Sequence, residues 1–240
     1  MLRCFNLRNR QVEHRQKNIE QSPQLKILLS IIRPLVAYVV LSVATLLMLT
    51  MIIDYSSLRP DIHFLQFKQE YMHISWWVAA FYIHVFSSVL ALAAGFTQFS
   101  NYILVNHSRI HRAMGKFYVG NILLINFPAG MVLAIYANGL LPGKLAFITL
   151  DLLWFYFTYR GYVAIRKRDI AMHKEFMIRS FALTFSAITL RTWKIILTAT
   201  TDLDPQLLYM LDAWMGFIPN LLLAEWIIRR SKNAALAKGD

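Results

Sequence analysis

The sequence predicts an all-α integral membrane protein, a polytopic bundle of six transmembrane helices with both termini in the cytoplasm. Three observations lead to this prediction. Hydrophobic residues make up 57% of the 240-residue chain and charged residues only 16%, whereas about a quarter of the residues in a soluble domain are charged. Apolar segments long enough to cross a bilayer recur along the chain. The basic residues are concentrated in alternate connecting segments.

The membrane spans are predicted from length and hydrophobicity. A transmembrane helix needs about 20 mostly apolar residues, because the hydrocarbon core is about 30 Å thick and a helix rises about 1.5 Å per residue. We therefore expect spans at about 35–53, 76–99, 117–137, 145–163, 181–200 and 207–228. Residues 1–34 then form a basic N-terminal tail, and residues 229–240 form a C-terminal tail.

The segments between and within the spans carry turn and break signals. Residues 54–75 are polar, and turns are predicted at Asn138–Gly143 and Asp202–Pro205. Pro128 and Pro219 lie inside the third and sixth spans. Because proline has no backbone N–H, we expect each of these two helices to break near its proline.

The distribution of charge predicts the orientation. Of the 25 Lys and Arg residues, 20 lie in the N-terminal tail, in residues 100–116 and 160–179, and after residue 228. The positive-inside rule therefore places both termini in the cytoplasm. We expect the net charge of +12 to attract anionic lipid on that face. It does not indicate nucleic acid, because no binding fold accompanies it. Membrane protein partners or a homo-oligomer remain open.

Five ionisable residues fall in the outer halves of the predicted spans, namely His84, Asp151, Arg191, Lys194 and Asp212. A charged residue at the centre of a membrane helix costs about 2.5–3.5 kcal/mol, so such residues mark candidate functional sites. They can also form a paired charge network that only fixes helix packing. Because a guanidinium cannot lose its charge, we expect Arg191 to pair with Asp151 or Asp212.

Small residues follow His84 along one face of the second span, at Ser88, Ala91 and Gly95. Such a stripe lets another helix backbone approach closely. It could equally leave room for a flat haem b that is ligated by His84. Both interpretations are open from the sequence.

Two further histidines lie at the predicted cytoplasmic ends of spans. His111 precedes the third span and His173 precedes the fifth, 62 residues later, so two helical hairpins could form a degenerate repeat. His107 lies four residues before His111, a chelating distance on a helix. These three histidines are candidate ligands of a transition metal. The alternative is a basic rim that binds lipid headgroups.

No enzyme class is predicted. The chain has no phosphate-binding loop, no GxSxG, no HExxH and no pair of cysteines, so hydrolase and nucleotide-driven activities lack support.

Several of these residues together resemble a bacterial family of predicted membrane proteins of unknown function (domain of unknown function 2306). The resemblance covers about residues 76–200. It rests on His84, the run His111-Arg112-x-x-Gly115-Lys116-x-Tyr118, the run His173-x-x-Phe176-Met177-x-Arg179-Ser180, and Arg191. It implies a multi-pass protein of the bacterial inner membrane and no established activity. A looser similarity is to cytochrome b561-type membrane haem proteins, although the chain lacks their two pairs of mid-helix histidines.

Three functions follow as hypotheses. The first is a redox or electron-transfer protein that binds haem b or a transition metal through some of His84, His111 and His173, with Arg179 and Arg191 as further cofactor-binding candidates. The second is a small proton-coupled transporter that uses His84, Asp151, Arg191 and Asp212. The third is a membrane assembly or structural factor without chemistry of its own.

Overall fold

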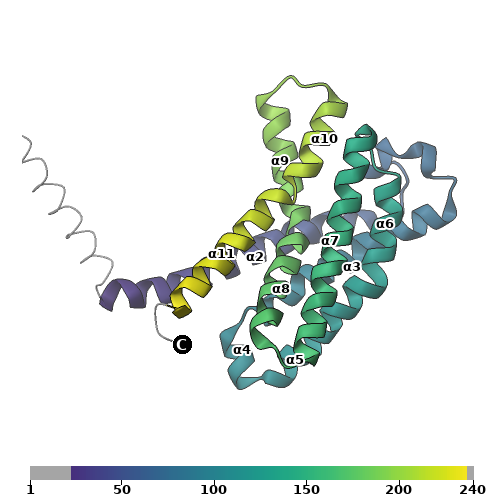
Figure 1. The fold of residues 1–240 in the computed structure, drawn as a ribbon. Helices are drawn as coiled ribbons and strands as arrows, with labels where there is room; N and C mark the ends of the chain where they lie inside the picture. Colours follow the sequence, from purple (N-terminus) through teal and green to yellow (C-terminus); the bar gives the residue numbers. More distant parts are fainter. Residues whose placement is uncertain (1–22, 237–240) are drawn as a thin grey trace, which may run out of the picture. The chain divides into compact units, whose positions relative to one another are not determined.

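The computed structural model describes residues 23–236, so most of the predicted N-terminal tail and the last four residues lie outside the described part (Figure 1). The chain divides into two units, residues 1–43 and residues 44–240. In the first unit the described residues belong to helix α2 (Pro23–Tyr55), which continues into the second unit. Side chains such as Leu35, Val36 and Val39 are more than half exposed there. In a bilayer this apolar surface would contact lipid.

The second unit is built from helices joined by short connections. Two 3₁₀ turns, η1 (His63–Phe67) and η2 (Gln69–Tyr71), lie in the polar connection after α2. The remaining elements are α3 (Ser75–Gln98), α4 (Asn101–Asn106), α5 (Ser108–Gly120), the π-helical turn η3 (Asn121–Asn126), α6 (Phe127–Ile135), α7 (Leu140–Arg166), α8 (Ile170–Thr184), α9 (Ser186–Thr200), α10 (Pro205–Met215) and α11 (Ile218–Leu236). The described residues contain no strand, in agreement with the predicted all-α class.

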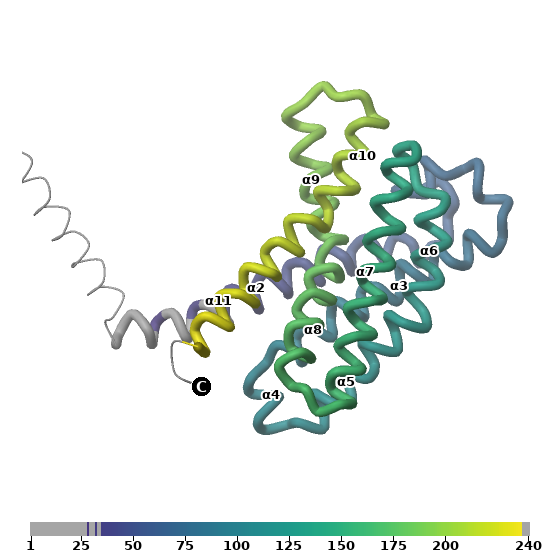
Figure 2. Tube along the Cα trace, in the orientation of Figure 1, coloured from purple at the N-terminus to yellow at the C-terminus, as the bar shows by residue number. Residues whose placement is uncertain are grey.

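Helix α7 lies at the centre of this unit and packs against α6, α8 and α10, while α3 packs against α5 and α6 (Figure 2). Apolar side chains from these helices fill the core between them, with Ala91, Tyr118, Ile122, Trp154 and Leu183 among the most buried. The small residues after His84 belong to this core, because Ala91 and Gly95 are buried on α3. The small-residue face thus serves close helix packing, which is the first of the two interpretations of the stripe.

Five described segments are long and apolar enough to cross a membrane: 35–55, 75–98, 108–135, 140–166 and 205–236. They correspond to the first, second, third, fourth and sixth predicted spans. The fifth prediction, residues 181–200, is not confirmed as a span. Its residues divide between α8 and α9 at Phe185, and α9 has only 15 residues, or about 22 Å of helix. The number of spans and the side of the termini therefore stay predictions.

Both predicted proline breaks are confirmed. The third span widens into the π-helical turn η3 directly before α6, in which Pro128 occupies the first turn. The sixth span is interrupted between α10 and α11, and Pro219 follows at the start of α11. The predicted turn at 138–143 is shorter than expected. Gly139 adopts a left-handed φ of 80°, and α7 already begins at Leu140.

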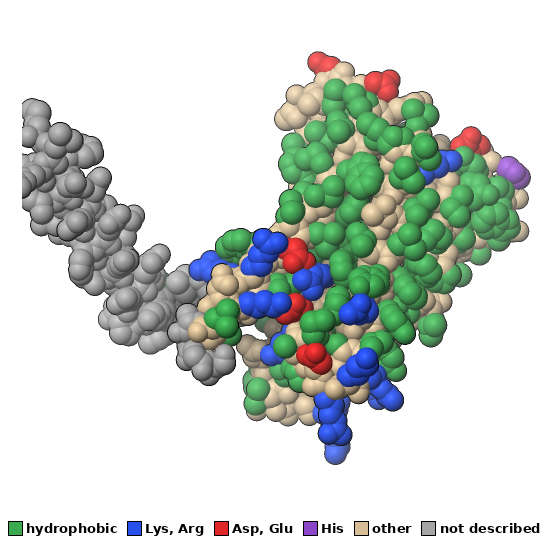
Figure 3. All heavy atoms as spheres, in the orientation of Figure 1, with side chains coloured by type: hydrophobic (Ala, Val, Ile, Leu, Met, Phe, Trp, Pro, Cys, Tyr) green, Lys and Arg blue, Asp and Glu red, His purple; other side chains and the backbone are tan. Residues whose placement is uncertain are grey.

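The surface of the second unit is strongly apolar. Leu124, Ile195 and Leu222 are 77%, 71% and 66% exposed, and hydrophobic side chains cover much of the face drawn in Figure 3. A soluble monomer rarely exposes apolar patches of this extent. On the same face, Lys and Arg side chains gather at one end of the helices, as the sequence predicts.

Candidate functional site

A histidine and an aspartate from different helices approach the same glycine inside the helix bundle. Helix α3 positions His84, α7 positions Asp151, and both side chains reach the backbone of Gly130 on α6. A Cβ added to Gly130 would lie 2.9 Å from Asp151 Oδ1 and 3.3 Å from His84 Cε1. Glycine is therefore required here by space, because a methyl group would overlap the carboxylate.

An asparagine and a serine complete this site. Asn126 is fully buried at the end of η3, and its Oδ1 accepts a hydrogen bond of 2.7 Å from Ser88 Oγ on α3. His84 hydrogen-bonds to the backbone of Asn126. The π-helical turn has a local cause, because Pro128 cannot donate to the carbonyl of Leu124 and the chain relaxes into a wider turn. We call His84, Ser88, Asn126 and Asp151 the intramembrane polar cluster.

The cluster contains polar atoms without partners. His84 Nδ1, Asn126 Nδ2 and Asp151 Oδ2 are all buried, and the described part of the chain supplies none of them with a hydrogen-bond partner. A buried polar group left unpaired costs about 1–3 kcal/mol. Native proteins leave few such groups, and those that occur call for an explanation such as a bound water, proton or ion. Here three such atoms come from α3, η3 and α7, and η3 packs against both helices.

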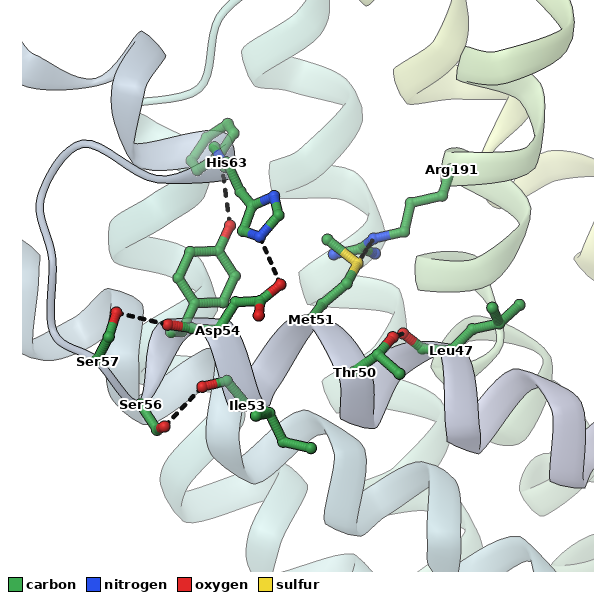
Figure 4. A network of polar contacts seen from close by, with 11 residues as sticks. Leu47, Thr50, Met51, Ile53, Asp54, Ser56, Ser57, His63 and Arg191 are labelled. Carbon is green, nitrogen blue, oxygen red and sulfur yellow. Dashed lines mark hydrogen bonds and ion pairs between the residues drawn. The ribbon is translucent and has the colours of Figure 1, made fainter.

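The predicted ion pair of Arg191 is wrong. None of the ion pairs among the described residues includes Arg191. Its Nε lies 3.2 Å from the sulfur of Met51, and its Nη1 donates to the carbonyl of Ala187 at 2.7 Å (Figure 4). Asp151 is instead committed to the polar cluster, and Asp212 attracts Arg191 only from beyond ion-pair distance.

Asp212 and Lys194, the other two predicted members of the network, do not pair either. Asp212 is 2% exposed, and its Oδ1 has no partner in the described structure. Lys194 is exposed on α9, with its Nζ 5.8 Å from the centre of the Phe67 ring. The five ionisable residues thus separate into His84 and Asp151, which both approach Gly130, and a group of charges that are near one another but not paired.

The predicted metal-binding set of His107, His111 and His173 is not supported. Among residues 23–236, no three His, Cys, Asp or Glu side chains are placed to share a metal ion. His111 Nδ1 lies 3.5 Å from the carbonyl oxygen of Thr97, and His173 Nδ1 lies 2.9 Å from that of Gly161. His111 therefore ties α5 to the end of α3, and His173 ties α8 to the C-terminal part of α7. His107 is exposed and rests against the Tyr102 ring.

Haem binding at His84 is not supported. The small-residue stripe is occupied by helix packing, since Asn121 Nδ2 on η3 donates to the carbonyl of Ser87 at 2.9 Å. A Cβ added to Gly130 would lie 3.3 Å from His84 Cε1, so α6 also packs closely against the imidazole.

The two histidine runs converge through a hydroxyl network that the sequence analysis missed. Tyr118 Oη on α5 lies 2.9 Å from Ser180 Oγ and 2.7 Å from Thr184 Oγ1, both on α8. From α7, Trp154 Nε1 donates to Thr184, and Thr158 Oγ1 lies 2.7 Å from Ser180 Oγ. All five side chains are buried. Hydroxyl groups are common in apolar spans, so only the spacing between Tyr118 and Ser180 in the two runs could have signalled this contact.

Arg179, a predicted cofactor-binding residue, belongs to an ion-pair network. Its Nε and Nη2 donate to the two oxygens of Glu225 on α11 at 2.5 and 3.0 Å. Glu175 lies 3.8 Å away and also pairs with Lys232 at 2.7 Å. The hydrogen bond to Glu225 raises the pKa of the Arg179 guanidinium above its ordinary value. This bidentate pair joins α8 to α11 and leaves Arg179 little capacity for a cofactor.

The fold and the site define an α-helical membrane protein with a polar cluster buried between its helices. The chain belongs to the family described as "Predicted membrane protein (DUF2306)", whose match covers residues 81–228. That match contains His84, Asn126, Asp151 and Arg191, and extends beyond the expected 76–200 to include α10 and most of α11. No curated protein and no solved structure shows a significant match, and the similarity to cytochrome b561-type proteins finds no support.

Proposed function

We propose that this protein is a proton-linked membrane transporter in which His84 and Asp151 bind and release the coupled proton. The observation that carries the proposal is that both side chains lie against Gly130, within segments apolar enough to cross a membrane. A histidine and a carboxyl group are the side chains that most readily exchange protons near neutral pH once their surroundings shift them. Ionisable residues inside spans are characteristic of proton relays.

The surroundings of the pair supply the other parts that a carrier needs. Asn126 Nδ2 and Asp151 Oδ2 have no partner and can bond to a water molecule or a polar solute. The π-helical turn η3 and the break between α10 and α11 interrupt two spans. Such interruptions are tolerated in membranes where the freed backbone groups line a cavity or a protein interior, and they are common in transporters. Haem or metal binding lacks comparable support, for the reasons given above.

The proposal is tested by proton flux in proteoliposomes that contain the full chain and a trapped pH-sensitive dye. With the candidate co-substrates chloride, sulfate, phosphate and succinate supplied outside, an inward pH gradient should drive protons inward faster than in protein-free liposomes. His84→Gln and Asp151→Asn should each abolish the additional flux. His107→Gln is the matched control, because it removes an exposed histidine outside the cluster and should leave the flux unchanged.

Two outcomes would contradict the proposal. The first is wild-type flux equal to that of protein-free liposomes. The second is flux that persists in both cluster variants while their reconstituted amounts match the wild type. Either result would favour a structural role, in which the cluster only fixes the packing of α3, α6 and α7.

A further inference from the structure

We propose that Arg191 is the substrate-binding residue of this transporter, and that the substrate is a small anionic group carried together with the proton on His84. This inference rests on the proposed function and adds the substrate class to it. The anionic group could belong to a soluble anion or to an acidic lipid headgroup, which share the same chemistry toward a guanidinium.

The guanidinium of Arg191 has few hydrogen-bond partners among the described residues. Its guanidinium bonds to one carbonyl, that of Ala187, and to the sulfur of Met51. A thioether is a weak acceptor. No described residue accepts a hydrogen bond from Nη2, and no carboxylate among the described residues forms an ion pair with Arg191. Figure 4 shows the side chain extending from α9 to Met51 on α2, separate from the Asp54–His63 pair.

A permanent cation in this position requires a counterion. Arg cannot be deprotonated in a protein, and a charged side chain within a span is normally paired or faces a water-filled cavity. Its planar fork binds carboxylate and phosphate groups through two parallel hydrogen bonds. An anion from outside the described residues is therefore the group that best completes the coordination of Arg191.

A second cation lies on the same face of the helix. Lys194 follows Arg191 by three residues on α9, a spacing that places two side chains side by side. Lys194 is exposed and has no ion pair among the described residues, and its Nζ lies over the Phe67 ring. Helix α9 thus presents two positive charges that no carboxylate in the described structure neutralises by direct contact.

The coupling to protons follows from electrostatics. Charges in the low-dielectric interior of a helix bundle act on one another beyond direct contact, and the positive charge of Arg191 acts on His84 in this way. A proton on His84 adds positive charge to the surroundings of Arg191 and strengthens its attraction for an anion, and a bound anion favours that proton by the same free energy. The other titratable groups around the two residues are Asp151 on α7, Tyr55 on α2 and Asp212 on α10. Asp212 opposes anion binding by repulsion.

The test is thermal unfolding of the full chain in neutral detergent, followed by intrinsic tryptophan fluorescence. The probes are chloride, sulfate, phosphate and succinate, each titrated from low salt, and phosphatidylglycerol in a separate series. We expect at least one probe to raise Tm, and the increase to be larger at pH 5.5 than at pH 8. A response to soluble anions alone identifies a soluble substrate, and a response to phosphatidylglycerol alone identifies a lipid headgroup.

Substitutions test whether the rise in Tm depends on Arg191. Arg191→Met should weaken the apparent affinity by about tenfold or more, as expected for the loss of a charge-assisted contact. His84→Gln should retain binding but lose its pH dependence, and Asp212→Asn should tighten binding. Arg160→Gln is the matched control, because it removes one positive charge from an exposed site on α7.

The results separate this inference from the proposed function. If no probe raises Tm, or if Arg191→Met and Asp212→Asn both respond like Arg160→Gln, the anion site is overturned even when proton flux depends on His84. If the Arg191-dependent response is present but proton flux is absent, the anion site stands and the transport function fails. Asp212→Asn keeps the test decisive even if Arg191→Met does not fold.

Discussion

The hydroxyl of Tyr118 lies 2.9 Å from Ser180 Oγ, and the two residues are 62 positions apart. His111 and His173 are separated by the same offset, and the Nδ1 of each lies next to a carbonyl in the C-terminal part of an earlier helix, that of Thr97 on α3 and that of Gly161 on α7. The two hairpins, α3–α5 and α7–α8, thus share the same histidine–carbonyl contact. They meet through Tyr118 and Ser180, which occupy equivalent positions in the two histidine runs. This relationship supports the predicted hairpin repeat and assigns the histidines a role in holding the helices together.

The hydroxyl network makes Tyr118 a stability determinant. Tyr118→Phe removes the oxygen that joins Ser180 and Thr184 and leaves buried hydroxyls with fewer partners, so we expect a loss of about 1–3 kcal/mol. The measurement is unfolding of the purified protein in detergent. Tyr102→Phe, at an exposed tyrosine on α4, is the control and should change stability little. Equal stability of Tyr118→Phe and wild type would show that the network contributes nothing.

Gly130 provides a direct test of the polar cluster. Gly130→Ala places a methyl group 2.9 Å from Asp151 Oδ1 and 3.3 Å from His84 Cε1, so the carboxyl group and the imidazole must shift away from α6. We expect the proton flux described above to fall at least as far as it does in His84→Gln. Gly120→Ala is the matched control, since nothing lies within 4 Å of the added Cβ. Identical flux in the two alanine variants would show that contact at Gly130 is not needed.

Hydrophobic length was sufficient to predict most of the membrane helices, because burial in lipid depends on composition over about 20 residues. The same criterion was insufficient at residues 181–200. There Arg191 and Lys194 lower the hydrophobicity, and the chain breaks at Phe185. The proline breaks were predictable from the missing N–H, but the π-helical form of η3 was not, because a proline within a helix can also produce a plain kink.

The polar residues of the site could be predicted from the sequence, but not which of them lie next to one another. His84 and Asp151 stood out as ionisable residues in apolar spans, and both lie against Gly130. The partner of Arg191 was predicted wrongly, because opposite charge does not determine which helix faces which. Lys68 was missed altogether. It belongs to a polar connection, yet it is 1% exposed and donates to the carbonyl of Tyr136 at 2.5 Å and to Asn138 Oδ1.

Topology is the most direct test of the span count. Reporter fusions after Ser57, Asn138 and Asp202 should report the outside, and fusions after Asn106, Asp169 and Asp240 the cytoplasm, if six segments cross the membrane. Fusions at Asp169 and Asp202 on the same side would show that residues 181–200 do not cross. The C-terminus would then lie outside if the remaining five segments all cross.

Lys68 predicts a pH dependence of stability. Burial disfavours the ammonium ion and lowers the pKa of Lys68 from 10.5 to about 8, with nearby Lys144 lowering it further and Glu70 opposing the shift. Between about pH 8 and 10.5 the folded protein binds fewer protons than the unfolded chain, so the free energy of unfolding should rise with pH in this window, by an amount on the order of 1–3 kcal/mol.

The measurement is chemical unfolding of the wild type and of Lys68→Met at pH 7.5 and pH 10. Other groups titrate in this range, so the difference between the two proteins is the quantity of interest, and it should shift in favour of the wild type at pH 10. Lys116→Met, at an exposed lysine, should instead follow the wild type. A constant difference between wild type and Lys68→Met would refute the predicted linkage.

Removal of a nearby carboxylate should restore stability to the Arg179→Leu variant but not to the Arg191→Leu variant. Arg179 forms a bidentate pair with Glu225, so Arg179→Leu leaves that carboxylate without its partner. Because Glu225 is partly exposed, we expect a loss of about 1–2 kcal/mol. The double change with Glu225→Gln should recover part of this loss.

Arg191 has no ion pair among the described residues, so Asp212→Asn should not rescue Arg191→Leu. Folded yield and unfolding midpoints of the six variants and wild type measure both cycles. Rescue in the Arg191 cycle would show that Asp212 is its counterion and that no external anion is needed.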